Sequence, residues 1–131
     1  RINPESASHV KANKTEEAIL GLMMLKEEHL RLCVDKLSVD SFVTPFNRKV
    51  FEKISEIYNQ YKKFDLGLLS GDFTLDEISR ITKMQSDRGR LTVNDEKVLN
   101  GYIDTLVQEK QKGVDSDTFD SILEAIKNKK K

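Results

Sequence analysis

The fold is decided by the stretch Ala18-Ile19-Leu20-Gly21-Leu22-Met23-Met24-Leu25. This apolar run stands in a chain in which 34% of the residues are charged. Glu16 and Glu17 precede it and Lys26-Glu27-Glu28 follow it, so strong helix formers flank both ends. Because the run is apolar on every face of a helix, it predicts the buried central helix of a bundle. It is too short to span a membrane, which takes about 20 apolar residues.

Length and charge limit the classes of function. A chain of 131 residues suits one domain with a small appendage. The chain has 22 basic residues (Lys and Arg) and 22 acidic residues (Asp and Glu). This balance argues against nucleic-acid binding by the charge of the whole domain. The single cysteine, Cys33, excludes an internal disulfide and is interpreted as a small core side chain. A reducing, cytoplasmic compartment fits this composition.

The first residues of the chain carry no apolar periodicity. Residues 1–13 mix Asn, Pro, Ser, Ala and Lys, which predicts a flexible tether from upstream domains and a folded domain that begins near Asn13. The polar stretch up to Lys14 does not resemble a signal peptide, and the missing initiator methionine suggests a fragment of a longer chain.

Between residues 14 and 92 apolar residues recur with helical spacing. After a bend or short loop at residues 26–29, a second stripe runs over residues 30–37. Thr44 and Pro45 are suited to open a helix with one wide apolar face. That face holds Val50, Phe51, Ile54, Ile57, Tyr58 and Tyr61.

Shorter signals complete this bundle. Phe42 and Phe46, in a turn-like setting, are expected to plug it. Asp65 is expected to cap a short helix that Ser70 and Gly71 end. Thr74-Leu75-Asp76-Glu77 matches a reciprocal capping box, which fixes the start of the next helix. The buried face of that helix is predicted to hold Ile78, Ile81 and Met84, before a charged loop at residues 85–90.

Two more helices are expected at the C-terminal end. Thr92 or Asn94 caps a long helix that closes at Gly113. Only residues 114–115 separate it from a last helix opened by Ser116, and so short a connection favours an antiparallel hairpin. The apolar stripe of the last helix consists of Phe119, Ile122, Leu123 and Ile126.

The chain shows no strand pattern. The predicted fold class is therefore all-α, with a bundle of about five to six helices over residues 14–92. A helical hairpin over residues 93–131 follows this bundle.

The sequence contains no recognisable catalytic, cofactor or metal site. It has no Gly-rich phosphate loop, no C-x-x-C, no H-E-x-x-H and no G-x-S-x-G. His9 and His29 have no partners at metal-ligand spacing and are interpreted as surface histidines. The lysines from Lys127 to Lys131 complement the negative end of a helix, and contact with phosphates or acidic lipid is their second interpretation.

Three stretches together carry a family resemblance. They are Glu16-Glu17-Ala18-Ile19-Leu20-Gly21-Leu22-Met23, Leu37-Ser38 with Phe42, and Asn47-Arg48-Lys49-Val50-Phe51-Glu52-Lys53-Ile54. In this order and spacing they resemble the helical bundle shared by the C-terminal domain of bacterial DNA primases and the N-terminal domain of bacterial replicative helicases. Residues 69–77, residues 102–106 and the lysine-rich end look more like the primase version.

The resemblance to primase implies a non-catalytic interaction domain. It implies that the domain binds the collar of the hexameric replicative helicase and brings primer synthesis to the fork, with the catalytic nucleotidyltransferase domain elsewhere. The contact helix corresponds to residues 116–130. The residues expected to contact the helicase are Phe119, Ile122, Leu123, Ile126, Lys127 and Lys130. We expect a monomer in the bacterial cytoplasm without cofactor, membrane contact or strong nucleic-acid binding, and a single-stranded DNA-binding protein stays open as a further partner.

Two other functions fit the same pattern. The first is the N-terminal domain of a replicative helicase, an oligomerisation module that forms the collar and would self-associate. The second is a helical adaptor whose basic tail binds nucleic acid or a membrane, with binding that depends on salt.

Overall fold

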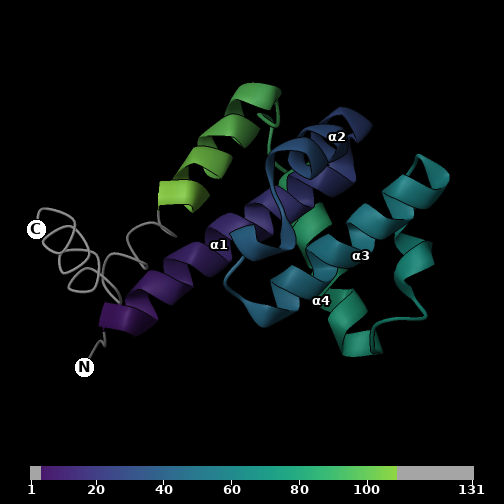
Figure 1. Ribbon diagram of the computed structural model, residues 1–131, viewed down its shortest axis with the longest axis horizontal. Coiled ribbons are helices and arrows are strands. Elements are labelled where there is room, and N and C mark those ends of the chain that lie inside the picture. Colours follow the sequence, from purple (N-terminus) through teal and green to yellow (C-terminus); the bar gives the residue numbers. More distant parts are fainter. Residues whose placement is uncertain (1–3, 109–131) are drawn as a thin grey trace, which may run out of the picture.

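The computed structural model describes the backbone of residues 4–108 and the side-chain surroundings from residue 12 onward (Figure 1). Its elements are α1 (Pro4–Leu25), α2 (Glu27–Lys36), η1 (Val39–Ser41), α3 (Pro45–Tyr61), η2 (Leu66–Leu69) and α4 (Leu75–Gly89). Residues 96–108 are also helical. Residues 4–108 contain no strand, and the predicted all-α helical bundle is confirmed.

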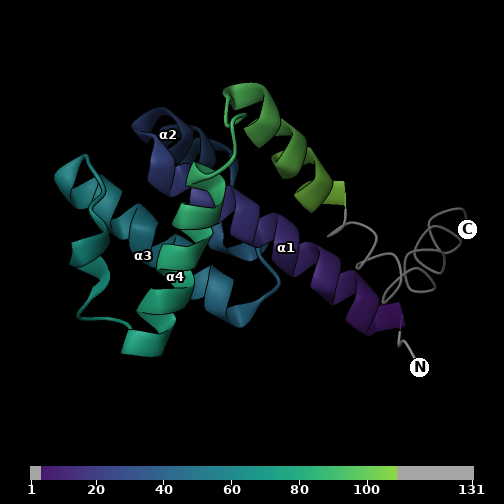
Figure 2. The same ribbon diagram turned by 180° about the vertical axis from the view of Figure 1, so that it is seen from behind.

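Helix α1 lies at the centre of the bundle. It packs against α2, α3 and α4, and the helix over residues 96–108 runs beside it in both views (Figures 1 and 2). The buried residues of the decisive apolar run are Ile19, Leu20, Gly21, Leu22, Met23 and Met24. The prediction of a buried central helix is therefore confirmed. No helix within residues 4–108 is both long and apolar enough to cross a membrane.

Gly21 brings α1 and α4 together. A Cβ atom at Gly21 would overlap the carbonyl oxygen of Met84 and would lie 2.6 Å from Cγ of Arg88. Such separations are well inside van der Waals contact, so a larger side chain would push the two helices apart. The backbones meet here because residue 21 has no side chain.

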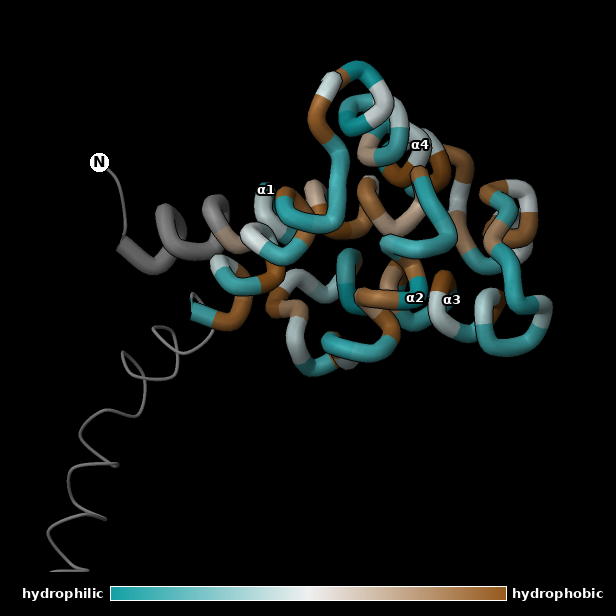
Figure 3. Tube along the Cα trace, turned by 90° about the horizontal axis from the view of Figure 1, so that it is seen from above, coloured by the Kyte–Doolittle hydropathy of each residue, from teal (hydrophilic) through white to brown (hydrophobic). Residues whose placement is uncertain are grey.

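The other wall of the core comes from α3 and the segment before it. The rings of Phe42 and Phe51 lie 4.8 Å apart between centroids and are both buried. Phe46 is half-buried and meets Phe73 edge-on at 6.1 Å. Figure 3 shows hydrophobic and hydrophilic residues alternating along the helices, as expected for amphipathic helices around one core. The prediction that Phe42 plugs the bundle is confirmed.

Local capping follows the sequence signals at two helix starts. The Asp65 side chain accepts a hydrogen bond from the backbone N–H of Gly67 at 2.9 Å. At α4, Thr74 Oγ1 accepts from the Glu77 N–H at 3.1 Å, and Glu77 Oε1 accepts from the Thr74 N–H at 2.9 Å. This is the predicted reciprocal box, which satisfies donors that a helix start leaves without partners. Thr44 makes no side-chain cap, although Pro45 does open α3.

Two boundaries differ from the sequence prediction. Helix α1 begins at Pro4, so residues 4–13 are helical where a flexible tether was expected. Proline suits a first helical position, and extending an existing helix costs far less than starting one. Helix α4 continues to Gly89, through most of the expected charged loop at residues 85–90. It continues because Arg88 follows Ile81 and Met84 on the buried face.

Candidate partner-binding groove

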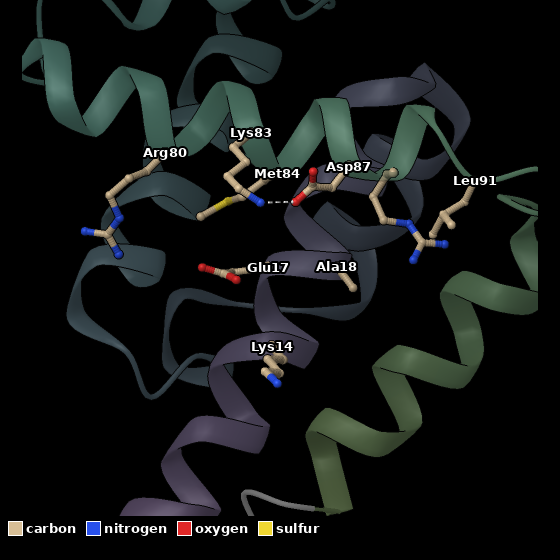
Figure 4. Close-up of a pocket in the computed structure, with 9 residues that line it drawn as sticks. Lys14, Glu17, Ala18, Arg80, Lys83, Met84, Asp87 and Leu91 are labelled. Carbon is tan, nitrogen blue, oxygen red and sulfur yellow. Dashed lines mark hydrogen bonds and ion pairs between the residues drawn. The ribbon is translucent and has the colours of Figure 1, made fainter.

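The predicted helicase-contact residues fall outside the part of the chain that the structure describes. They are Phe119, Ile122, Leu123, Ile126, Lys127 and Lys130. The described residues do form a groove, of about 440 Å³, between α1 and α4 (Figure 4). Its lining residues are Lys14, Glu17, Ala18, Arg80, Lys83, Met84, Asp87, Arg88 and Leu91.

The floor of the groove is apolar and its rims are charged. Ala18 comes from α1 and Met84 from α4, while Leu91 follows α4 and is 51% exposed (Figure 4). Of the charged lining residues, four are cationic and two are carboxylates: Lys14, Arg80, Lys83 and Arg88 against Glu17 and Asp87. A surface with apolar floor and charged rims is suited to an amphipathic helix.

The cations of α4 are held in place to different degrees. Lys83 Nζ donates to Asp87 Oδ2 at 2.7 Å, and this hydrogen bond lowers the pKa of the Asp87 carboxyl. Both side chains are largely solvent-exposed, so the pair contributes little to stability. The guanidinium of Arg80 stacks 4.0 Å from the ring centroid of Phe46. This contact fixes Arg80 at the end of the groove.

Arg88 is the buried charge of the groove, with 7% of its surface exposed. Its Nε donates to Asn94 Oδ1 at 3.1 Å, Nη1 to the Tyr102 hydroxyl at 3.2 Å and Nη2 to the Val93 carbonyl at 3.4 Å. All three acceptors are uncharged. Among residues 12–108 no carboxylate forms an ion pair with it. A guanidinium has five N–H donors, so Arg88 keeps donors for an anionic partner.

The same network attaches the helix over residues 96–108 to the bundle. Asn94 Nδ2 donates to the carbonyls of Arg88 and Leu91 at 2.8 and 2.9 Å. His29 Nε2 lies 2.6 Å from the Asn94 carbonyl oxygen, so α2 contributes as well. His29 is 3% exposed, and its interpretation as a surface histidine is wrong.

The helix over residues 96–108 is capped by Asp95, whose Oδ1 accepts a hydrogen bond from the Val98 N–H. The sequence had predicted Thr92 or Asn94 as the cap.

A second buried polar cluster lies on the opposite side of α1. Glu16 is fully buried, and its carboxylate accepts from the Val43 N–H at 2.7 Å and from Asn47 Nδ2 at 2.9 Å. Asn47 Nδ2 also donates to Asn13 Oδ1 at 2.9 Å. These bonds tie the start of α3 to α1. The cluster does not line the groove, and Asn47 Oδ1 is buried in it without a hydrogen-bond partner.

Possible metal ligands and the cysteine are the remaining reactive side chains of the described residues. No group of three or more His, Cys, Asp or Glu side chains within them is placed to hold a metal ion. Cys33 is buried as predicted, and burial raises the pKa of its thiol to about 12. A thiol with so high a pKa is not a nucleophile at neutral pH.

Sequence reasoning missed the polar residues that are buried. Glu16 stands on the same helical face as Ile19, Leu20 and Met23, and Arg88 stands on that of Ile81 and Met84. Their positions in these stripes were a usable signal for burial. Nothing in the linear pattern indicated the long-range partners, since Asn94 is 65 residues from His29.

Comparison with known protein families gives one match, which covers residues 8–95 of the 131-residue chain. It is to the family described as the DnaB-like helicase N terminal domain. Curated proteins and solved structures give no match. The matched range includes α1 to α4 and ends just before the helix over residues 96–108. Since the match covers more than half of its length, the chain belongs to the DnaB-like helicase N-terminal domain family, a non-catalytic helical domain.

Proposed function

We propose that this chain is the helicase-binding domain of a bacterial DNA primase, which couples primer synthesis to the replication fork in the cytoplasm. The family match supports a helical domain of the kind found in replicative helicases, and it is equally consistent with the alternative below. The observation that carries the primase version is the resemblance of residues 69–77 and 102–106 to that version.

The proposed helicase contact lies on the last predicted helix. Ile122 and Ile126 would supply its apolar part, together with Phe119 and Leu123. Lys127 and Lys130 would set orientation and association rate more than affinity, as charges at the rim of an interface do. Through this contact the domain would bring the primase to the helicase, a role that needs no catalytic residue.

Paired substitutions test the contact. Ile122→Asp should weaken binding to the replicative helicase of the same organism by at least about tenfold, which is about 1.4 kcal/mol. Ser121→Asp is the matched control, because residue 121 falls on the opposite face of a helix from the apolar stripe. Binding is measured by biolayer interferometry on immobilised helicase. Equal affinities for both variants and the unaltered chain would place the contact elsewhere.

Deletion gives a second test of the same contact. Removing residues 116–131 should abolish helicase binding and leave a cooperative thermal transition. If the shortened chain binds with unchanged affinity, the contact lies on the bundle. Loss of the cooperative transition would instead show that the last segment belongs to the core.

The alternative is the helicase collar itself, with which the family match is equally consistent. In that case the domain would assemble with copies of itself. The discriminating property is the molar mass in solution at micromolar concentration, because the primase version is expected to be a monomer of 15.0 kDa.

A further inference from the structure

The groove between α1 and α4 has an excess of positive charge that the described residues do not balance. Its four cations face two carboxylates, and one of these, Asp87, is already paired with Lys83. Arg88 is more than nine-tenths buried and bonds to neutral acceptors alone among the described residues. A buried guanidinium is strongly stabilised by a carboxylate partner. An occupant that matches this groove is therefore apolar on one face and acidic.

One segment of this chain has that composition. Residues 114–126 carry four acidic side chains and no basic one. The acidic residues are Asp115, Asp117, Asp120 and Glu124. The same segment holds the apolar stripe of Phe119, Ile122, Leu123 and Ile126, which would match the floor formed by Ala18, Met84 and Leu91. Along the predicted helix, Asp120 borders this stripe, so a helix docked by the stripe would bring Asp120 to a rim of the groove.

The chain is long enough for this segment to reach the groove. The helix over residues 96–108 flanks the groove, and its last described residue lies toward the N-terminal half of α1 (Figures 1 and 4). The predicted antiparallel turn after Gly113 would bring the next helix back along residues 96–108, and twelve helical residues cover about 18 Å.

We propose that residues 115–126 dock into the groove of their own chain, with the apolar stripe on Ala18, Met84 and Leu91 and an acidic side chain on Arg88 or Lys83. The groove is then an internal docking surface that covers the apolar stripe while no partner is bound. The docking does not depend on the proposed helicase contact. If both hold, helicase has to displace the segment from the groove before it can bind.

Paramagnetic broadening in the full chain tests the docking. A nitroxide is attached to Ser121→Cys, on the face away from the stripe, and the buried Cys33 stays unlabelled because its thiol has a pKa of about 12. The backbone amide signals of Ala18, Met84 and Leu91 should lose intensity. Those of Asn59 and Gln60, at the far end of α3, should keep it. Unchanged groove signals would overturn the proposal.

A mixed sample separates docking within one chain from docking between copies. Isotope-labelled chain without nitroxide is combined with unlabelled chain that carries it. Groove signals should keep their intensity in this mixture. If the broadening is as strong as when isotope and nitroxide are in the same chain, a second copy fills the groove, which would contradict docking within one chain.

Charge reversal tests the chemistry of the contact. Lys83→Glu should restore the intensity of the amide signals of Ala18, Met84 and Leu91. Lys63→Glu makes the same charge change on the exposed loop after α3 and should leave these signals broadened. Phe119→Ser should also restore them through loss of the apolar contact. Well-dispersed amide spectra establish that each variant is folded. If Lys83→Glu and Phe119→Ser both leave the broadening intact, the segment does not dock in this groove.

Discussion

Gly21 shows how one residue sets the distance between two helices. Its Cα faces the Met84 carbonyl and the Arg88 side chain, with no room for a Cβ. Since Met84 and Arg88 also line the groove, the glycine fixes the width of that groove as well as the packing of the core. A residue without a side chain therefore shapes the candidate binding surface.

Gly21→Ala should destabilise the domain by about 1–3 kcal/mol, the usual cost of overpacking a core. Gly101→Ala is the matched control, because a Cβ there meets nothing within 4 Å on an exposed helical position. The control should be stabilised by about 0.5–1 kcal/mol through the better helix propensity of alanine. Urea unfolding followed by circular dichroism measures both. A Gly21→Ala variant as stable as the control would contradict the close packing.

Phe51→Ala should lower the free energy of unfolding by about 3–5 kcal/mol, as expected for truncation of a buried aromatic residue. Phe51 is 3% exposed and stacks on Phe42, so the substitution removes packing on two sides. Chemical unfolding gives the value. A loss below about 1 kcal/mol is typical of a surface position and would remove Phe51 from the core.

Cys33 should react slowly with a thiol reagent at pH 8 in the folded chain and rapidly in urea. Burial raises the pKa of its thiol from 9.0 to about 12. The thiol is protonated in both states below pH 9, but between pH 9 and 12 only the unfolded chain ionises, so this group lowers stability as pH rises. Absorbance of the released reagent follows the reaction. Fast labelling without urea would show that Cys33 is accessible.

At the scale of elements, short signals at helix ends decide where the chain changes direction. The box formed by Thr74 and Glu77 starts α4 at the point that lets Ile81, Met84 and Arg88 face α1. Asp95 starts the helix over residues 96–108 in a similar way, by accepting from the Val98 N–H. Both starts therefore position elements that border the groove.

Thr74→Ala should cost about 1 kcal/mol, because the Glu77 N–H loses its side-chain acceptor. Thr82→Ala is a useful control, since the Thr82 hydroxyl donates to the Ile78 carbonyl within the helix and is not needed to close a helix end. Thr82→Ala should leave the melting temperature unchanged or raise it slightly, because alanine has a better helix propensity than threonine. Differential scanning calorimetry compares the two melting temperatures. Equal melting temperatures would argue against a role of the cap in stability.

Apolar periodicity predicted the helices well, because burial of a stripe dominates the choice of structure. The central helix and the face of α3 followed from it, except for Tyr61, which is 50% exposed, and the start of α4 followed from the capping box. It did not predict the helical residues 4–13 or the last turn of α4, where helix continues through polar sequence. Nor did it predict that Glu16, His29 and Arg88 are buried, since their burial depends on hydrogen-bond partners distant in sequence.

At the scale of the whole molecule, the groove lies on the side of α1 against which α4 packs. The family relation identifies a helicase-associated domain, and the groove between α1 and α4 supplies a surface with apolar floor and cationic rims. The helix over residues 96–108 leads from this groove toward the proposed contact segment. The arrangement suits a domain that binds partners through helices.

Sedimentation velocity of the chain alone and with the hexameric replicative helicase of its source organism tests the central claim most directly. The account predicts a monomer near 15.0 kDa at micromolar concentration that moves into the helicase boundary when the two are mixed. A chain that assembles with itself and stays out of the helicase boundary would contradict the proposed primase role and support the collar.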